Sequence, residues 1–207
     1  MILYLHGFRS SPSSAKAQIM QQALQARGQM ARWHCPQLPI DPQQAIDRCV
    51  ALIQQHHQPG QPLALIGSSL GGFYATCLAE RWPEARTVVL NPVVHAARDL
   101  AKYQGTLTNF HTGEPFDFGP ADVQALARLE CTQISRPERY FLVAATGDEI
   151  LDWREMAAHY AAAKQKIIDG SDHGLSDFPK HLPDILAFLD LPLEPVSADQ
   201  PNHQPTR

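Results

Sequence analysis

The sequence lacks the features that mark membrane, nucleic-acid-binding and secreted proteins. No apolar run approaches the ~18 residues that a membrane-spanning helix needs. The 17 Lys and Arg residues are scattered and the formal net charge is −4, so no basic patch favours nucleic acid or an anionic membrane surface. The amino-terminal stretch MILYLHGF has neither a basic segment nor a small-residue cleavage site, so it does not resemble a secretory signal.

Cysteine is scarce and shows no metal-binding or disulfide pattern. The four cysteines, at positions 35, 49, 77 and 131, include no C-x-x-C pair. In a chain of 207 residues, this spacing predicts reduced cysteines rather than a disulfide framework or a zinc site. We therefore expect a cytoplasmic protein without a metal or an organic cofactor, and the sequence leaves its oligomeric state open.

Short apolar runs alternate with segments of helical spacing along most of the chain. The predicted strands are residues 2–6, 30–35, 63–67, 86–91, 140–145 and 164–169. Predicted helices lie between them: one from Ala15 to about Gly28, one after the Asp41 cap, one over 70–82, and one after Asp152, with Glu155 placed for a capping box. This alternation predicts an α/β fold of three layers, with a mostly parallel sheet of about six strands and helices on both faces.

We expect a single domain over residues 1–190, interrupted by one long connection. Residues 95–137 are too long for a simple link, so we expect them to form a lid or a pocket wall. Their aromatic side chains predict either a pocket lining or a small core of the insertion itself; they are Tyr103, Phe110, Phe116 and Phe118. Residues 191–207 are proline-rich and polar, which predicts a disordered tail.

The stretch LALIGSSLGGFYAT, residues 63–76, passes from an apolar run through two serines and three glycines into a helical pattern. In the pattern G-x-S-x-G, small residues two positions before and after a serine permit a strained turn that exposes its hydroxyl. Ser69 has Gly67 and Gly71 at these positions, whereas Ser68 is flanked by larger side chains and is expected only to shape the turn. The alternatives are a plain glycine-rich turn or a phosphate cradle, although no P-loop lysine follows the glycines.

A serine nucleophile on this architecture needs an acid and a histidine after later strands. TGDEILD follows the strand over 140–145, and Asp148 comes directly after its Thr-Gly corner. Glu149 is expected to point away, and Asp152 is better explained as a helix cap. His173 is the histidine that lies in a loop after the last predicted strand, downstream of Ser69 and of Asp148. Its neighbour Asp172 is a weaker acid candidate, because adjacent side chains rarely meet.

The end of the first strand offers one side of an oxyanion hole. In LYLHGF, Gly7 permits close approach of the backbone, and the N–H of Phe8 would pair with that of Leu70 at the start of the helix after the serine. We expect His6 to brace this loop rather than to act as the base.

Three motifs carry a resemblance to a known superfamily. LYLHGFRSSPSSAKA, GSSLGGFYAT and TGDEILD resemble those of the α/β-hydrolase superfamily and, within it, of small bacterial esterases of the YqiA/YcfP type. The resemblance spans about residues 2–190 and implies a serine esterase with Ser69, Asp148 and His173 as its triad. The expected partner is a small-molecule ester that is cleaved through an acyl-enzyme. Thioester hydrolysis, C–C bond hydrolysis and ligand binding without turnover remain as alternatives.

Overall fold

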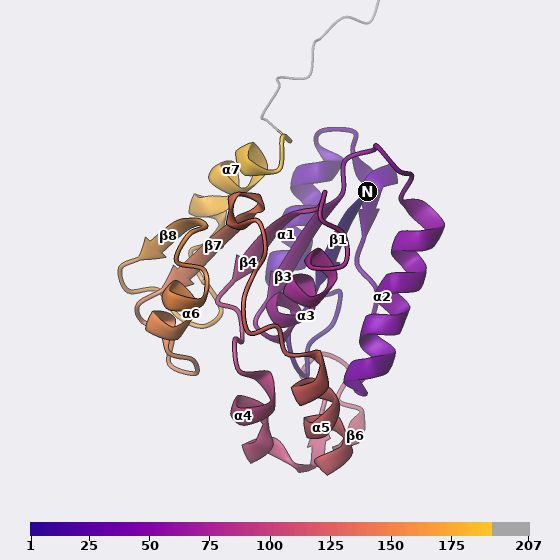
Figure 1. The fold of residues 1–207 in the computed structure, drawn as a ribbon, viewed down its shortest axis with the longest axis vertical. Coiled ribbons are helices and arrows are strands. Elements are labelled where there is room, and N and C mark those ends of the chain that lie inside the picture. Colours follow the sequence, from indigo (N-terminus) through magenta and orange to yellow (C-terminus); the bar gives the residue numbers. More distant parts are fainter. Residues whose placement is uncertain (192–207) are drawn as a thin grey trace, which may run out of the picture.

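A six-stranded sheet in which every neighbouring pair is parallel forms the centre of the molecule (Figure 1). The structure is a computed structural model and describes residues 1–191. In spatial order the strands are β2 (Trp33–His34), β1 (Ile2–Leu5), β3 (Ala64–Ser68), β4 (Arg86–Leu90), β7 (Tyr140–Ala145) and β8 (Lys164–Ile168). This architecture confirms the predicted fold class.

Helices cover both faces of the sheet because alternate strand residues point to opposite sides. Ile2 and Tyr4 of β1 pack with α1 (Ala15–Gln25) and α7 (Phe178–Phe188) on one face. Leu3 and Leu5 pack on the other face, which α2 (Pro42–His56), α3 (Leu70–Ala79) and α6 (Trp153–His159) cover. The result is the predicted three-layer arrangement.

Two helices begin at the predicted aspartates. The Asp41 carboxylate accepts the N–H of Gln43 at 2.8 Å and precedes Pro42 at the first helical position of α2. Asp152 caps α6 and accepts the N–H of Arg154 at 2.9 Å. The predicted capping box is wrong, because the Glu155 carboxylate pairs with the Arg98 guanidinium at 2.9 Å instead.

The clearest differences from the prediction concern one strand and two helices. The strand predicted over 30–35 is only β2, because Met30–Arg32 forms a 3-10 turn before it. The helix predicted over 70–82 ends at Ala79. The prediction did not include α7, which contains Pro183 within its length.

The insertion folds into its own elements at one end of the sheet (Figure 1). It consists of α4 (Ala96–Leu100), a hairpin of β5 (Gly105–Thr108) and β6 (Pro115–Phe118), and α5 (Pro120–Leu129). Helix α5 packs against α4 and also against α2, which joins the insertion to the main layers.

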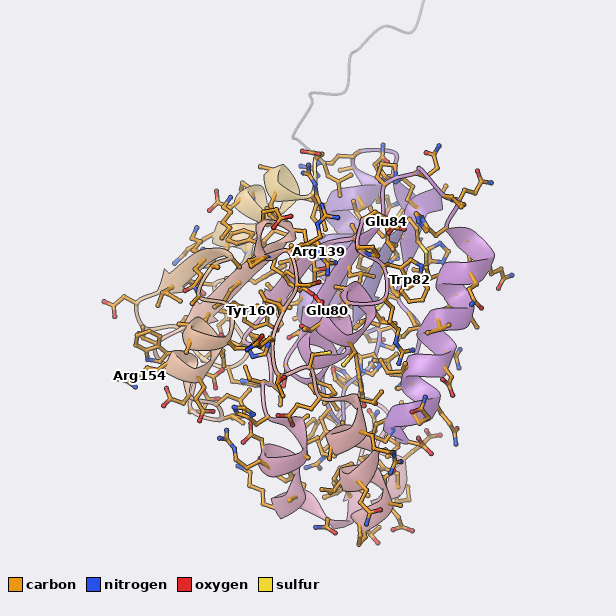
Figure 2. The ribbon with its side chains drawn as sticks, viewed as in Figure 1. Glu80, Trp82, Glu84, Arg139, Arg154 and Tyr160 are labelled. Atoms are coloured by element: carbon orange, nitrogen blue, oxygen red, sulfur yellow. The ribbon has the colours of Figure 1, made fainter. Side chains whose placement is uncertain are left out.

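A buried ion pair fixes the far end of α3 (Figure 2). Arg139 donates to the Glu80 carboxylate at 2.8 Å and to the Ala79 carbonyl at 2.6 Å. The Tyr140 hydroxyl donates to the same carboxylate. These bonds tie the last carbonyls of α3 to the start of β7.

The last described residue of the chain lies in the core. Leu191 is buried and donates its N–H to the Leu186 carbonyl at 2.8 Å. Residues 192–207, which make up the rest of the predicted tail, lie outside the described residues.

Candidate active site

Ser69 occupies a strained turn between β3 and α3. Its backbone angles, φ 54° and ψ −121°, fall in a region that side-chain-bearing residues rarely adopt. Neighbouring backbone holds this conformation: the Ser69 N–H donates to the Leu90 carbonyl at 3.0 Å, and the Ser69 carbonyl accepts the N–H of Val93 at 3.1 Å. The turn is therefore fixed by the end of β4 as well as by its own sequence.

The glycines that flank Ser69 allow three backbone segments to meet. A Cβ atom on Gly67 would lie 2.1 Å from the Gly71 carbonyl oxygen, and one on Gly71 would lie 2.0 Å from the Leu5 carbonyl oxygen. Both distances are far below van der Waals contact. A Cβ on Gly7, in the loop after β1, would lie 3.2 Å from the Ser69 Cβ, so this loop also passes close to the serine.

The structure brings Ser69, His173 and Asp148 into one chain of hydrogen bonds. His173 Nε2 lies 3.0 Å from Ser69 Oγ, and His173 Nδ1 lies 2.8 Å from Asp148 Oδ2. The three residues follow β3, β8 and β7, whose carboxyl ends meet at one edge of the parallel sheet. With Nδ1–H donating to the carboxylate, Nε2 is left to accept the serine proton.

The Asp148 carboxylate is fully buried and held in place. Its side chain has 0% exposure, against 17% for that of His173. Its second oxygen accepts the N–H groups of Ile150 and Leu151, each at 2.9 Å. These bonds aim the carboxylate at the imidazole.

The other predicted acids lie elsewhere. The Glu149 carboxylate accepts the backbone N–H of His173 at 2.9 Å, so it contacts the histidine without reaching its ring. The Asp172 carboxylate accepts the N–H of Ser176 at 2.8 Å, and the hydrogen bonds from Ser176 lower its pKa. Asp152 caps α6, as predicted.

Asn91 links three strand ends and was not selected from the sequence. Its side-chain amide donates to the carbonyls of Asp172 and His173 at 3.0 and 3.1 Å. Its amide oxygen accepts the Ala145 N–H at 2.8 Å. The sequence feature that could have identified Asn91 is a polar residue directly after a mostly apolar strand.

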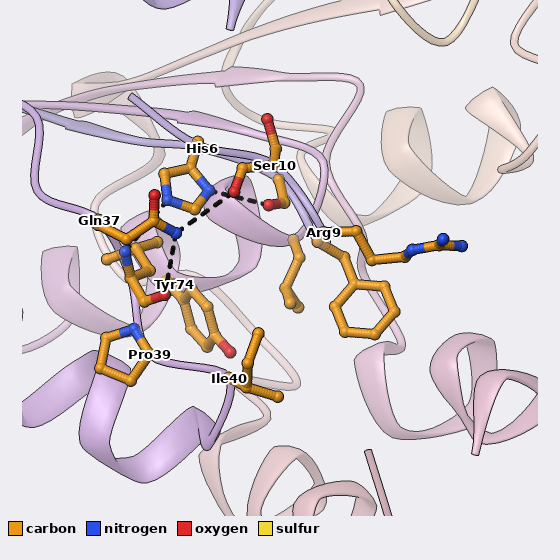
Figure 3. A pocket seen from close by; sticks show the side chains of 11 residues that line it. His6, Arg9, Ser10, Gln37, Pro39, Ile40 and Tyr74 are labelled. Atoms are coloured by element: carbon orange, nitrogen blue, oxygen red, sulfur yellow. Dashed lines mark hydrogen bonds between the residues drawn. The ribbon is translucent and has the colours of Figure 1, made fainter. Parts of the chain in front are cut away.

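The loop after β1 is held by His6. Its Nε2 accepts the N–H of Leu38 at 3.1 Å, so Nδ1 carries the proton and donates to the Gly7 carbonyl at 3.0 Å. Burial lowers the pKa of His6, which favours the neutral ring that this pattern needs. Figure 3 shows Gln37 bonded to the Ser10 carbonyl of the same loop.

The predicted oxyanion donors lie on either side of the serine turn. Phe8 belongs to the loop that approaches Ser69, and Leu70 is the first residue of α3. Within residues 1–191, neither backbone N–H donates to a protein acceptor.

Two cavities meet at Ser69 and His173. The first cavity has a volume of about 150 Å³, and we call it the apolar cavity because most of its lining is apolar: Phe8, Val93, Leu100, Tyr103, Ile150 and Leu151. The charged residues Arg9, Asp99 and Lys102 also border it. The second cavity has a volume of about 290 Å³, and we call it the polar cavity because hydroxyl and amine side chains contribute to its lining: Tyr4, Ser10, Ser14, Lys16 and Ser68. Phe110 borders both cavities.

Two aromatic residues of the insertion line a cavity, and the other two pack into the main core rather than into a core of the insertion itself. Tyr103 and Phe110 line the apolar cavity. The rings of Phe116 and Phe118 pack against Phe8, with centroids 6.0 and 5.1 Å away. The insertion therefore contributes to the wall of the apolar cavity and to the main core, and the predicted separate core of the insertion is wrong.

The described residues contain no group of three or more His, Cys, Asp or Glu side chains arranged to hold a metal ion. Within the same part of the chain, no helix is long and apolar enough to cross a membrane.

Comparison with known proteins places the chain in a family. Residues 1–190 match the family described as "Uncharacterised protein family (UPF0227)". The chain belongs to UPF0227. This match confirms the resemblance that the three motifs carry.

Solved structures share the fold of this UPF0227 protein at low sequence identity. Est1E from Butyrivibrio proteoclasticus, solved with ferulic acid bound, has a TM-score of 0.66 and 12% identity, covering 91% of this chain and 86% of Est1E. A monoacylglycerol lipase from Paleococcus ferrophilus has a TM-score of 0.61 and 14% identity over 92% and 94% of the two chains. Mouse alpha/beta hydrolase domain-containing protein 10 has a TM-score of 0.64 and 13% identity over 91% and 90%. The fold is thus that of the α/β hydrolases.

Proposed function

We propose that this UPF0227 protein is a serine esterase that hydrolyses small carboxylic esters through an acyl-enzyme on Ser69. The observation that carries the proposal is the continuous series of hydrogen bonds from Ser69 Oγ through His173 to the buried Asp148. Such a series provides a base for the serine proton and a counter-charge for the imidazolium that forms.

The reaction would run in two halves. Ser69 Oγ attacks the ester carbonyl carbon while His173 Nε2 takes its proton, and Asp148 stabilises the resulting cation. The N–H groups of Phe8 and Leu70 hold the oxyanion, which collapses as His173 passes the proton to the departing alcohol. His173 then removes a proton from water, whose oxygen attacks the acyl carbon; the acid leaves and Ser69 regains its proton.

Esterases and lipases among the proteins of this fold support the proposal, but they do not identify the ester that this protein hydrolyses. Est1E and the monoacylglycerol lipase share the architecture with this chain at 12% and 14% identity. The apolar cavity beside Ser69, of about 150 Å³, favours a short acyl or alkyl group. The cytoplasmic location expected from the sequence stays a prediction.

The test is hydrolysis of p-nitrophenyl acetate, butanoate and octanoate and of a thioester, with the wild type and two variants. Ser69→Ala is expected to abolish turnover of every substrate with an unchanged Tm. Asp148→Asn is expected to lower kcat by about 10⁴, the effect measured for the corresponding change in a serine protease, because the amide selects the wrong imidazole tautomer. Wild-type rates in the Ser69→Ala protein would overturn the proposal.

A further inference from the structure

A cluster of hydroxyl groups borders the polar cavity. The Tyr4 side chain has 0% exposure, and its hydroxyl lies close to those of Ser14 and Ser68 without forming a hydrogen bond of good geometry among residues 1–191. The Ser14 hydroxyl is buried and equally unpartnered within the described chain. Both residues line the cavity that reaches Ser69 and His173. A buried hydroxyl without a good partner costs about 1–3 kcal/mol, and a bound anion can accept hydrogen bonds from such a cluster of hydroxyls.

Lys16 adds a positive charge to the same cavity wall. Its ammonium donates to the Gly174 carbonyl, one residue beyond His173, and forms no ion pair among the described residues. An ammonium has three donors, so two remain for a ligand. Burial lowers the pKa of Lys16 to about 8, against the opposing influence of Asp172 and Asp148. The amine thus stays largely protonated at neutral pH.

The start of α1 adds a third favourable feature. The helix has 11 residues, its first turn carries no acidic side chain, and its N-cap Ser14 makes no capping bond. The first N–H groups of a helix and its dipole attract negative charge. Ser14, Ala15 and Lys16, at this helix end, all line the polar cavity.

We infer that the polar cavity binds an anionic group of the substrate, a carboxylate or a phosphate, through Lys16, Ser14 and Tyr4. The inference rests on the proposed function and narrows it to esters that carry an oxyanion on one arm and an apolar group on the other. The ester bond would lie at Ser69, where the two cavities meet. The apolar arm would enter the cavity lined by Tyr103 and Leu151.

Binding is measured by calorimetry on the Ser69→Ala protein, which cannot form an acyl-enzyme. The ligands are 4-carboxyphenyl butanoate, 4-phosphonooxyphenyl butanoate and phenyl hydrogen butanedioate, with the carboxamide isosteres of the two carboxylates as neutral references. The first and third place the carboxylate on the alcohol arm and on the acyl arm, so a preference for either supports the inference. Comparing the affinity of the second ligand with that of the first shows whether the cavity prefers phosphate or carboxylate.

At least one anionic ester is expected to bind about tenfold more tightly than its neutral reference, because a charge-assisted hydrogen bond is stronger than a neutral one. Lys16→Met is expected to remove this preference. Lys102→Met is the matched control, because Lys102 borders the apolar cavity and not the polar one, so the preference should survive this change. Tyr4→Phe removes one oxygen and is expected to weaken anion binding about threefold without lowering Tm, because that oxygen forms no hydrogen bond of good geometry with the described residues.

Equal affinity for anionic and neutral ligands would overturn the inference, as would equal losses in the Lys16 and Lys102 variants. The preference should also fall between pH 7 and pH 9, because Lys16 loses its proton as the pH rises through about 8 while the ligand carboxylate stays charged. Since the protein used for binding performs no chemistry, an anion preference without any esterase activity in the wild type would refute the proposed function alone.

Discussion

At the scale of single residues, the conformation of Ser69 depends on neighbours that lack side chains. Gly67 and Gly71 lie where backbone from β3, α3 and β1 converges, and no larger residue fits there. The positive φ of Ser69 is held by bonds to Leu90 and Val93 rather than by the serine side chain. The hydroxyl is therefore positioned by the backbone and remains free for its contact with His173.

Gly71→Ala is expected to destabilise the protein by about 3 kcal/mol, because the new Cβ would overlap the Leu5 carbonyl oxygen and force α3 away from β1. Urea denaturation measures this loss. Gly119→Ala is the control: the nearest atom to its Cβ is 4.0 Å away, so its cost should stay below about 1 kcal/mol. Similar losses in both variants would contradict the packing argument.

The sequence was informative about Ser69, Asp148 and His173 because each follows a predicted strand within a local pattern. The structure shows that their three side chains are joined by hydrogen bonds, whereas their catalytic roles remain predictions. Asn91 and Tyr4 could not be selected, because their importance depends on which strands are neighbours. Asn91 acts between β4 and β7, and the sequence does not state that these strands pair.

At the scale of elements, the site is an arrangement of strand ends. β3, β7 and β8 deliver the serine, the aspartate and the histidine, and β4 lies between the first two of these strands. Asn91, directly after β4, donates to the Asp172 carbonyl in the loop after β8. It also accepts the N–H of Ala145 at the end of β7. We therefore assign Asn91 as a positioning residue for the His173 loop.

Asn91→Ala is expected to lower kcat tenfold to a hundredfold with little change in KM, since a small displacement of the imidazole impairs proton transfer but not ester binding. It also leaves the buried Ala145 N–H unpaired, at a cost of about 1–3 kcal/mol. Steady-state kinetics and thermal denaturation separate the two effects. An unchanged kcat in the folded variant would show that Asn91 is only structural.

Element prediction succeeded where the local signal was strong and failed where distant residues decided the outcome. β7 matches its predicted range, 140–145, because six consecutive apolar residues favour a buried strand. The capping box at α6 failed because Arg98, far away in the sequence, pairs with Glu155. α7 was missed because Pro183 interrupts its pattern, as proline does in most helix interiors.

At the scale of the whole molecule, the insertion and the loop after β1 form one wall of the site. The Phe110 N–H donates to the Arg9 carbonyl at 2.8 Å, and the Arg9 guanidinium lies 4.0 Å from the Phe110 ring centroid. The Asn109 side chain donates to the Ser10 carbonyl at 3.0 Å. These contacts couple the hairpin to the segment that carries Phe8, while motion of the insertion as a lid stays a prediction.

Phe110→Ala is expected to lower kcat/KM for apolar esters three- to tenfold, because the ring borders both cavities and its loss removes apolar contact with substrate. The ring is 70% exposed, so Tm should change little. Kinetics across acyl-chain lengths and a melting curve check both statements. A large fall in Tm with unchanged kinetics would place Phe110 in the fold rather than in the pocket wall.

The most direct test of Ser69 as the nucleophile is reaction with a fluorophosphonate, followed by intact-mass measurement and peptide mapping. An activated serine attacks the phosphorus of the probe, which expels fluoride as the serine proton passes to the base, so we expect one covalent adduct per chain, on Ser69. Labelling should disappear in Ser69→Ala and slow markedly in His173→Ala. Folded wild-type protein that stays unlabelled, or that carries the adduct on another residue, would contradict the assignment of Ser69 as the nucleophile.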